Sequence, residues 1–123
     1  KMQKIDMHLI LTSTNGLFNE KQVPALYVQI QRYRGLLERQ LNKQITFSSA
    51  VHSWMENYFQ PICQIAQGKG LSFAYPEKSL AQRYFLVCAQ LEKQQNNNLK
   101  EAEMCLINNT TTPIRKFIAK TIA

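Results

Sequence analysis

The segment from residue 45 to residue 91 constrains the fold of this chain more than any other part of it. Apolar residues recur there at intervals of three and four, the spacing that places side chains on one face of an α-helix. Two such stretches flank a turn that contains Gly and Pro, and most of the aromatic residues of the chain lie in this segment. We therefore predict two amphipathic helices packed as a hairpin. Their stripes are Phe47, Val51, Trp54, Tyr58, Ile62 and Ile65 in the first and Leu80, Tyr84, Val87, Cys88 and Leu91 in the second.

Proline and glycine mark where these helices bend and end. Pro61 lies inside the first stripe, lacks a backbone N–H and clashes with the carbonyl four residues earlier. We therefore expect a kink near Tyr58 or a break just before Pro61. Gly68 and Gly70 are predicted to end the first helix, because glycine adopts the left-handed cap conformation at little cost. The short loop after them is predicted to fold back on the hairpin, and Pro76 suits the first turn of the next helix.

Helical patterns also precede and follow the central segment. Over residues 20–42, apolar side chains again recur every three or four positions. Near the C-terminus, Asn98 with Glu101 resembles a capping box that starts a short helix, and a last helix is predicted to start at Thr112-Pro113. Residues 1–11 fit both strand and helix periodicity, and we favour a short helix or an edge segment there. In the last helix, the side chains predicted to face the core are Ile114, Phe117, Ile118 and Ile122.

These patterns predict a single all-α domain over residues 1–123 with four or five helices. We expect an orthogonal or up-down bundle, built on an antiparallel hairpin of the helices at about 20–42 and 46–67. No apolar run in the sequence reaches the ~18–20 residues that a membrane span needs. Lys1 precedes Met2, which is the pattern expected of a domain cut from a longer protein.

Several residues of the central segment follow a recognisable order: Ala50, Ser53-Trp54, Tyr58, Pro61 and Ile65, then Leu71, Tyr75-Pro76, Tyr84 and Leu86. This order resembles a small helical domain of unknown function found in bacterial proteins. That domain has a Ser-Trp pair, a Tyr three to four residues on, a later Pro, and an aromatic-Pro pair before a Tyr-bearing helix. The resemblance covers about residues 45–94. It implies an all-α module without assigned chemistry. Some proteins that carry the domain are described as regulators or as partition-like proteins.

The net charge and the cysteines indicate the kind of partner and the cellular compartment. The net charge is +7, from fifteen Lys and Arg against eight acidic residues. Such a balance favours partners that are polyanions: nucleic acid, an anionic membrane surface or an acidic protein. The three cysteines are odd in number and widely spaced, which indicates reduced thiols and a cytoplasmic location. Each lies beside apolar residues in a helical pattern, so we expect small buried side chains rather than reactive groups.

Motifs that carry chemistry are missing from the sequence. Gly68-Lys69-Gly70 lacks the length and the following Ser or Thr of a phosphate-binding loop, and there is no nucleophile elbow. The histidines and cysteines have none of the spacings of a zinc site. His52 and Cys63 are eleven positions apart, about 16 Å along a helix, which is too far for a Cys–His pair. We therefore predict a protein that is not an enzyme and that has no cofactor and no metal.

Basic residues give the best indication of function. Arg32, Arg39 and Lys43 follow intervals of seven and four, on one side of a helix and away from its apolar stripe. Arg115, Lys116 and Lys120 lie on the last helix, after a Thr-rich loop, where free amides and hydroxyls suit a phosphate. Residues 98–123 also fit a helix-turn-helix variant, although the loop at 108–112 is longer than usual. These six cations are the predicted nucleic-acid contacts, and the alternative is a solvated polar face.

A second hypothesis concerns protein partners. Met55, Phe59 and Phe85 fall off the main stripes and predict a second apolar face. That face is either covered by the N-terminal segment and the last helix, or it binds a protein partner or a second copy of the chain. The sequence therefore favours a nucleic-acid-binding or regulatory module, and the alternative is a protein-interaction or dimerisation module.

Overall fold

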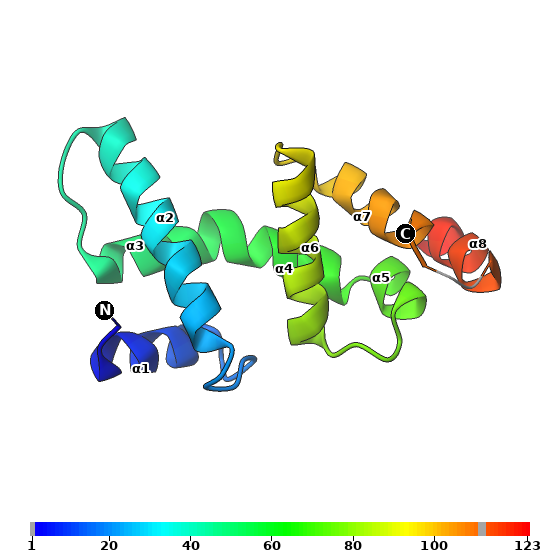
Figure 1. Cartoon of the computed structure of the whole chain (residues 1–123), viewed down its shortest axis with the longest axis horizontal. Helices are drawn as coiled ribbons and strands as arrows, with labels where there is room; N and C mark the ends of the chain where they lie inside the picture. The colour runs from blue at the N-terminus through cyan, green and yellow to red at the C-terminus, as the bar shows by residue number, and fades with distance from the viewer. Residues whose placement is uncertain (1, 111–112) are drawn as a thin grey trace. The chain divides into compact units, whose positions relative to one another are not determined.

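The computed structural model describes residues 2–110 and 113–123, and it describes residues 113–115 by their backbone alone (Figure 1). All regular elements in this part of the chain are helical, which confirms the all-α class. They are more numerous than the four or five predicted, because two of the expected helices are interrupted or preceded by short ones. The helices are α1 (Lys4–Ser13), α2 (Val23–Leu41), α3 (Phe47–Trp54), the π-helical η1 (Met55–Phe59), α4 (Gln60–Gln67), α5 (Lys69–Ala74), α6 (Leu80–Gln94), α7 (Leu99–Asn108) and α8 (Pro113–Ile122).

The chain divides into two compact units, Lys1–Phe59 and Gln60–Ala123, which we call the N-terminal and the C-terminal unit. The sequence predicted one helical domain, whereas each of these units has buried side chains of its own. The predicted hairpin of the helices at 20–42 and 46–67 runs across the boundary, so that only α2 with α3 packs as a hairpin inside one unit. The bundle topology expected from the sequence stays a prediction.

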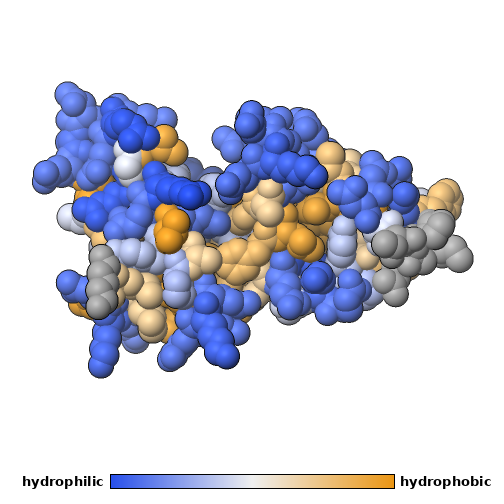
Figure 2. Space-filling view, in the orientation of Figure 1, coloured by the Kyte–Doolittle hydropathy of each residue, from blue (hydrophilic) through white to orange (hydrophobic). Residues whose placement is uncertain are grey.

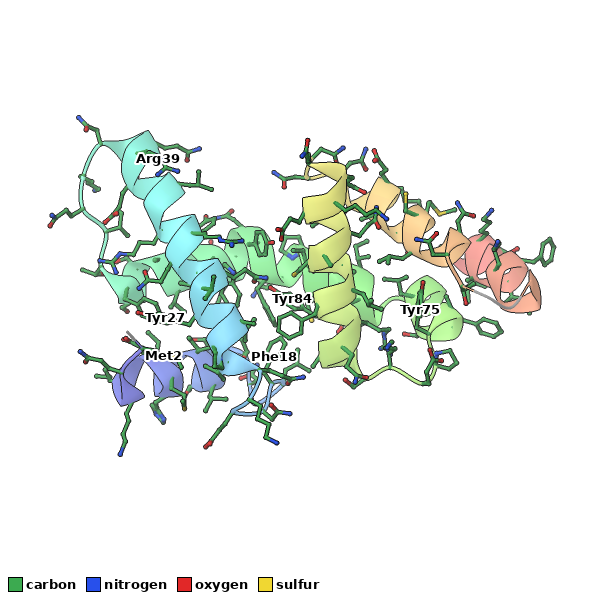
Figure 3. The ribbon with its side chains drawn as sticks, viewed as in Figure 1. Met2, Phe18, Tyr27, Arg39, Tyr75 and Tyr84 are labelled. Carbon is green, nitrogen blue, oxygen red and sulfur yellow. The ribbon has the colours of Figure 1, made fainter. Side chains whose placement is uncertain are left out.

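The N-terminal unit is built around Trp54, whose side chain is fully buried. Its indole ring lies 5.3 Å from the ring of Phe59, and Phe59 lies 6.0 Å from Phe18 in the connection between α1 and α2 (Figure 3). Leu26 and Ile30 of α2 are also fully buried. Aromatic side chains bury a large apolar area and pack with a preferred geometry, so this cluster supplies much of the stabilisation of the unit.

Local polar residues fix the ends of the helices in this unit. The Thr46 hydroxyl accepts a hydrogen bond from the amide of Ser49 and caps α3. Asn42 ends α2 in the left-handed conformation, with φ of 52°, which Asn tolerates better than most residues. Residues 4–13, which the sequence left open between strand and helix, form α1.

The irregularity expected before Pro61 is the π-helical segment Met55–Phe59, and α4 starts directly after it. Pro61 offers no N–H to the carbonyl four residues earlier. A turn closed over five residues instead of four is a local solution that keeps the backbone helical, and such segments inside α-helices are known as π-bulges.

In the C-terminal unit, α4 packs on α6, α6 on α7, and α5 on α8. Arg83 of α6 holds the connections by donating from Nε to the carbonyl of Ala66 at 2.7 Å and from Nη1 to the carbonyl of Lys78 at 2.7 Å. The Thr110 hydroxyl donates to the carbonyl of Ala74 at 3.1 Å and joins the end of α7 to α5. The predicted cap at Asn98 is confirmed, because its side chain accepts from the amide of Glu101.

Two local predictions for this unit are wrong. Gly68 follows the end of α4 in an extended conformation, with φ of −64°, and the next residues form α5 rather than a loop. The helix α6 starts at Leu80 and not near Pro76. The reason is a reciprocal capping box, in which Ser79 and Gln82 each accept a hydrogen bond from the backbone of the other.

The orientation of α8 also differs from the prediction. Phe117 is 72% exposed and Ile122 is 41% exposed, whereas Ala119 is fully buried. A close approach accompanies this orientation, since a Cβ added to Gly70 of α5 would lie 2.8 Å from the Cβ of Ala123, the residue after α8. Phe117 turns outward, while Ile118, which was also predicted to face the core, is half-buried. The side chain of Ile114 lies outside the described residues.

Candidate functional site

Exposed residues on one face of α2 combine cations with aliphatic side chains. Successive positions on this face are three or four residues apart, so the side chains form one line along the helix. We call this line the α2 outer face. It consists of Val28, Arg32, Leu36 and Arg39, all of which are exposed. Lys43, two residues beyond the end of α2, is exposed as well. Figure 3 labels Arg39 at the C-terminal end of the helix.

A third arginine of the same helix has a different role. Arg34 donates from Nε to the carbonyl of Ile45 at 2.7 Å, and Glu38 accepts from the amide of Ile45 at 2.9 Å. The Arg34 Nε and Glu38 Oε2 atoms are 3.7 Å apart. The two side chains therefore hold both backbone groups of one residue and fix the connection between α2 and α3. We call this arrangement the Ile45 clamp.

The clamp determines the charge of the α2 outer face. Glu38 is the only acidic residue between Lys21 and Met55, and its carboxylate is engaged with Arg34 and Ile45. Within residues 2–110 and 113–123, no carboxylate forms an ion pair with Arg32, Arg39 or Lys43. The positive charge of this face is therefore not compensated locally, and Figure 2 shows hydrophilic side chains over this end of α2 with apolar atoms between them.

Polar contacts beside this face anchor α2 to α3 and to the π-helical segment. The Tyr33 hydroxyl and the Ser53 hydroxyl are 2.7 Å apart. Asn57 donates from Nδ2 to the carbonyl of Ser53 at 3.0 Å, and Trp54 donates from its indole N–H to the Gln29 side chain at 3.3 Å. The sequence pattern gave no signal for the Tyr33–Ser53 and Trp54–Gln29 contacts, which join residues twenty or more positions apart.

The other predicted cations lie in the C-terminal unit. Lys120 on α8 is exposed and Lys116 is half-buried, while the side chain of Arg115 lies outside the described residues. The six predicted cations therefore belong to two units, and those of the N-terminal unit form the defined group. The loop of the predicted helix-turn-helix variant contains residues 111–112, which also lie outside the description.

The residues predicted for a protein partner do not form one face in either unit. Phe59 is only 6% exposed and belongs to the core of the N-terminal unit, where it contacts Trp54 and Phe18. Met55 is half-buried in the same unit. Phe85 is half-buried in the C-terminal unit, with its ring 5.4 Å from the ring of Tyr84.

Groups able to do chemistry remain scattered in the described part of the chain. His52 and Glu56 form a pair on the surface, with Nε2 and Oε1 3.2 Å apart and both side chains largely exposed. Burial raises the pKa of the Cys63 thiol, which lowers its thiolate fraction, the opposite of what a nucleophile needs. Among the described residues, no three His, Cys, Asp or Glu side chains come together to hold a metal ion.

Comparisons with known proteins give no further guide, since no protein family, no curated protein and no solved structure matches the chain. None of the helices in the described residues combines the length and the apolar character required to cross a membrane. The resemblance of residues 45–94 to a bacterial helical domain stays a prediction.

Proposed function

We propose that the N-terminal unit binds nucleic acid without catalysing a reaction, and that Arg32, Arg39 and Lys43 contact backbone phosphates. The observation that carries the proposal is the uncompensated charge of the α2 outer face. Cations that have no carboxylate partner exchange bound counterions for phosphates at little electrostatic cost. A regulatory role, and the cytoplasmic location indicated by the odd number of widely spaced cysteines, belong to the same proposal.

The spacing of the cations suits one strand of nucleic acid. Arg32 and Arg39 are seven residues apart on α2, or about 10 Å at a rise of 1.5 Å per residue. That length corresponds to about three phosphates at 3.4 Å per phosphate of one strand. The Ile45 clamp supports this use, because it fixes the connection that carries Lys43 relative to α2. Contacts of this kind position a protein on the backbone and do not read sequence.

The salt dependence of binding tests the proposal. In the full chain, we expect Arg32→Gln/Arg39→Gln to lower the slope of log affinity against log salt by about 1.8 for a duplex and about 1.4 for a single strand. The matched control is Lys4→Gln/Lys21→Gln, which removes two exposed cations from the same unit but from outside the face. Anisotropy of labelled oligonucleotides measures both. Equal losses in the two variants, or no binding by the unmodified chain, would refute the proposal.

A second candidate function is protein binding at the same face. Val28 is 49% exposed and Leu36 is 53% exposed, and phosphate contacts leave such aliphatic groups unused. An apolar face flanked by arginines suits an acidic protein partner or a dimer. Analytical ultracentrifugation distinguishes the dimer, since Val28→Gln/Leu36→Gln would then shift the mass towards the monomer while leaving the salt slope for nucleic acid unchanged.

A further inference from the structure

One aromatic side chain of α8 lies largely in solvent. Phe117 is 72% exposed, whereas Ala119, on the opposite side of the helix, is fully buried. On α5, the helix against which α8 packs, Phe73 is 38% exposed. In Figure 2, apolar atoms reach the surface at the α8 end of this unit.

Cations accompany both exposed aromatic side chains. Lys69 lies four residues before Phe73 on α5, and Lys120 lies three residues after Phe117 on α8, so each pair shares a helix face. Both lysines are exposed. From Met104 to Ala123 the sequence contains three cations and no acidic residue, and the preceding Glu103 is buried and paired with Lys100 at 3.1 Å. The exposed carboxylates of the unit belong to other segments, namely Glu77, Glu92 and Glu101.

We infer that these two aromatic–lysine pairs, Phe73 with Lys69 and Phe117 with Lys120, dock on an anionic lipid surface. Charge complementarity identifies the occupant, because apolar groups flanked by lysines match an interface of acyl chains and anionic headgroups. A second copy of the chain would present the same cations without a carboxylate and would be repelled. With ten residues α8 is about 15 Å long, too short to span a bilayer, so it would lie in the plane of the interface.

The exposure of Phe117 favours lipid over an acidic protein. A ring that is 72% exposed presents most of its surface to solvent rather than to a shaped pocket. A protein partner would have to supply the whole complementary surface, whereas the interfacial region of a bilayer accepts an aromatic side chain without a shaped partner.

Co-sedimentation of the full chain with vesicles tests the inference. We expect binding to vesicles of phosphatidylserine mixed with phosphatidylcholine, little binding to phosphatidylcholine alone, and release at high salt. Phe73→Ala/Phe117→Ala should weaken binding about ten-fold. Lys69→Gln/Lys120→Gln should weaken it about five-fold for each lysine removed. The matched controls are Val28→Ala/Leu36→Ala and Lys4→Gln/Lys93→Gln, which remove exposed apolar groups and cations elsewhere and should retain binding.

A spectroscopic variant separates insertion from simple electrostatic attraction. The chain has a single tryptophan, the fully buried Trp54, so a second one introduced by Phe117→Trp reports on α8. We expect its emission to shift to the blue on anionic vesicles and to be quenched by brominated acyl chains. An unshifted emission, equal losses in the control variants, or equal binding to an acidic polypeptide would overturn the inference. Arg32→Gln/Arg39→Gln should leave lipid binding intact, so this inference and the proposed function fail separately.

Discussion

The helices α2 and α8 are both amphipathic and both basic, yet they bury different kinds of side chain. In α2 the large aliphatic residues are inside, with Leu26 and Ile30 fully buried, and the cations lie on the outer face. In α8 a small residue, Ala119, is inside and the aromatic Phe117 is outside. An apolar stripe therefore identifies a face of a helix, but it does not decide which face is buried.

In each case, the helix against which α2 or α8 packs determines which face is buried. The α2–α3 contact includes Trp54, and large side chains from both helices fill the space between the two backbones. The α5–α8 contact has Gly70 on one side, and a Cβ there would already lie 2.8 Å from the Cβ of Ala123, the residue after α8. The distance between two helices depends on the side chains at their contact. A glycine on one helix can therefore change which face of the neighbouring helix is buried.

The largest expected effect comes from a pair of variants in which one buried and one exposed aromatic residue are replaced by alanine. We expect Trp54→Ala to lower the free energy of unfolding by about 3–5 kcal/mol, because it removes a fully buried ring from the N-terminal core. The matched variant Phe117→Ala should change it by less than about 0.5 kcal/mol, since that ring is mostly in solvent. Urea denaturation followed by far-ultraviolet circular dichroism measures both. A similar loss in the two variants would show that Phe117 is buried after all.

Alanine at two glycines tests the close approach directly. A Cβ at Gly70 would meet Ala123 at 2.8 Å, so Gly70→Ala should destabilise the C-terminal unit by about 1–3 kcal/mol. At Gly35, inside α2, the nearest atom to a new Cβ is Arg39 Nη1 at 3.9 Å. Gly35→Ala should therefore stabilise the N-terminal unit by about 0.5–1 kcal/mol through helix propensity.

Thermal unfolding distinguishes the two glycine variants by the sign of the change. Limited trypsin digestion adds a local measurement, since faster cleavage after Lys116 or Lys120 in Gly70→Ala would show that α8 has detached. If both variants raised the melting temperature, the contact between Gly70 and Ala123 would not be limiting, and another cause for the orientation of α8 would be required.

The sequence predicted the elements better than their packing. The helical periodicity over residues 20–42 and the cap at Asn98 depend on residues within a few positions of one another, and both are found. The helix α5 was missed, because six residues that start beside two glycines give too short a pattern to recognise. The outward turn of α8 was missed for a different reason, since it depends on a contact with Gly70.

For the candidate site too, the sequence predicted local features better than contacts between distant residues. The intervals between Arg32, Arg39 and Lys43 placed them away from the apolar stripe, and all three are exposed. The Ile45 clamp was not predicted, although it gives the site its uncompensated charge. It joins Arg34 to a backbone group eleven residues away, in a loop whose path the sequence does not reveal.

A third test compares two arginines of α2 that lie two positions apart. Arg34→Met removes the hydrogen bond to the Ile45 carbonyl and the pairing with Glu38, and it should cost about 1 kcal/mol of stability, since the side chain is partly exposed. Arg32→Met should change stability by less than about 0.5 kcal/mol and should instead weaken nucleic-acid binding. Chemical denaturation measures the stability of both variants, and anisotropy measures their binding to nucleic acid. The comparison fails if Arg32→Met is the more destabilising variant.

The smallest expected effect is a pH dependence of the stability of the C-terminal unit. Circular dichroism and Trp54 fluorescence separate it from the stability of the N-terminal unit. Burial raises the folded-state pKa of Cys63 in the C-terminal unit above its value in the unfolded chain. The neutral thiol therefore contributes stability that is fully present below the unfolded pKa of about 8.5 and is lost as pH rises through the folded-state value.

Alkylation of Cys63 by iodoacetamide should accordingly be slower than that of an unstructured cysteine at the same alkaline pH. Cys63→Ala should flatten the alkaline decline in stability seen by circular dichroism, while the unfolding transition seen by Trp54 fluorescence, which reports on the N-terminal unit, keeps its pH dependence. A change in the Trp54 transition instead would mean that the two units do not unfold as separate bodies.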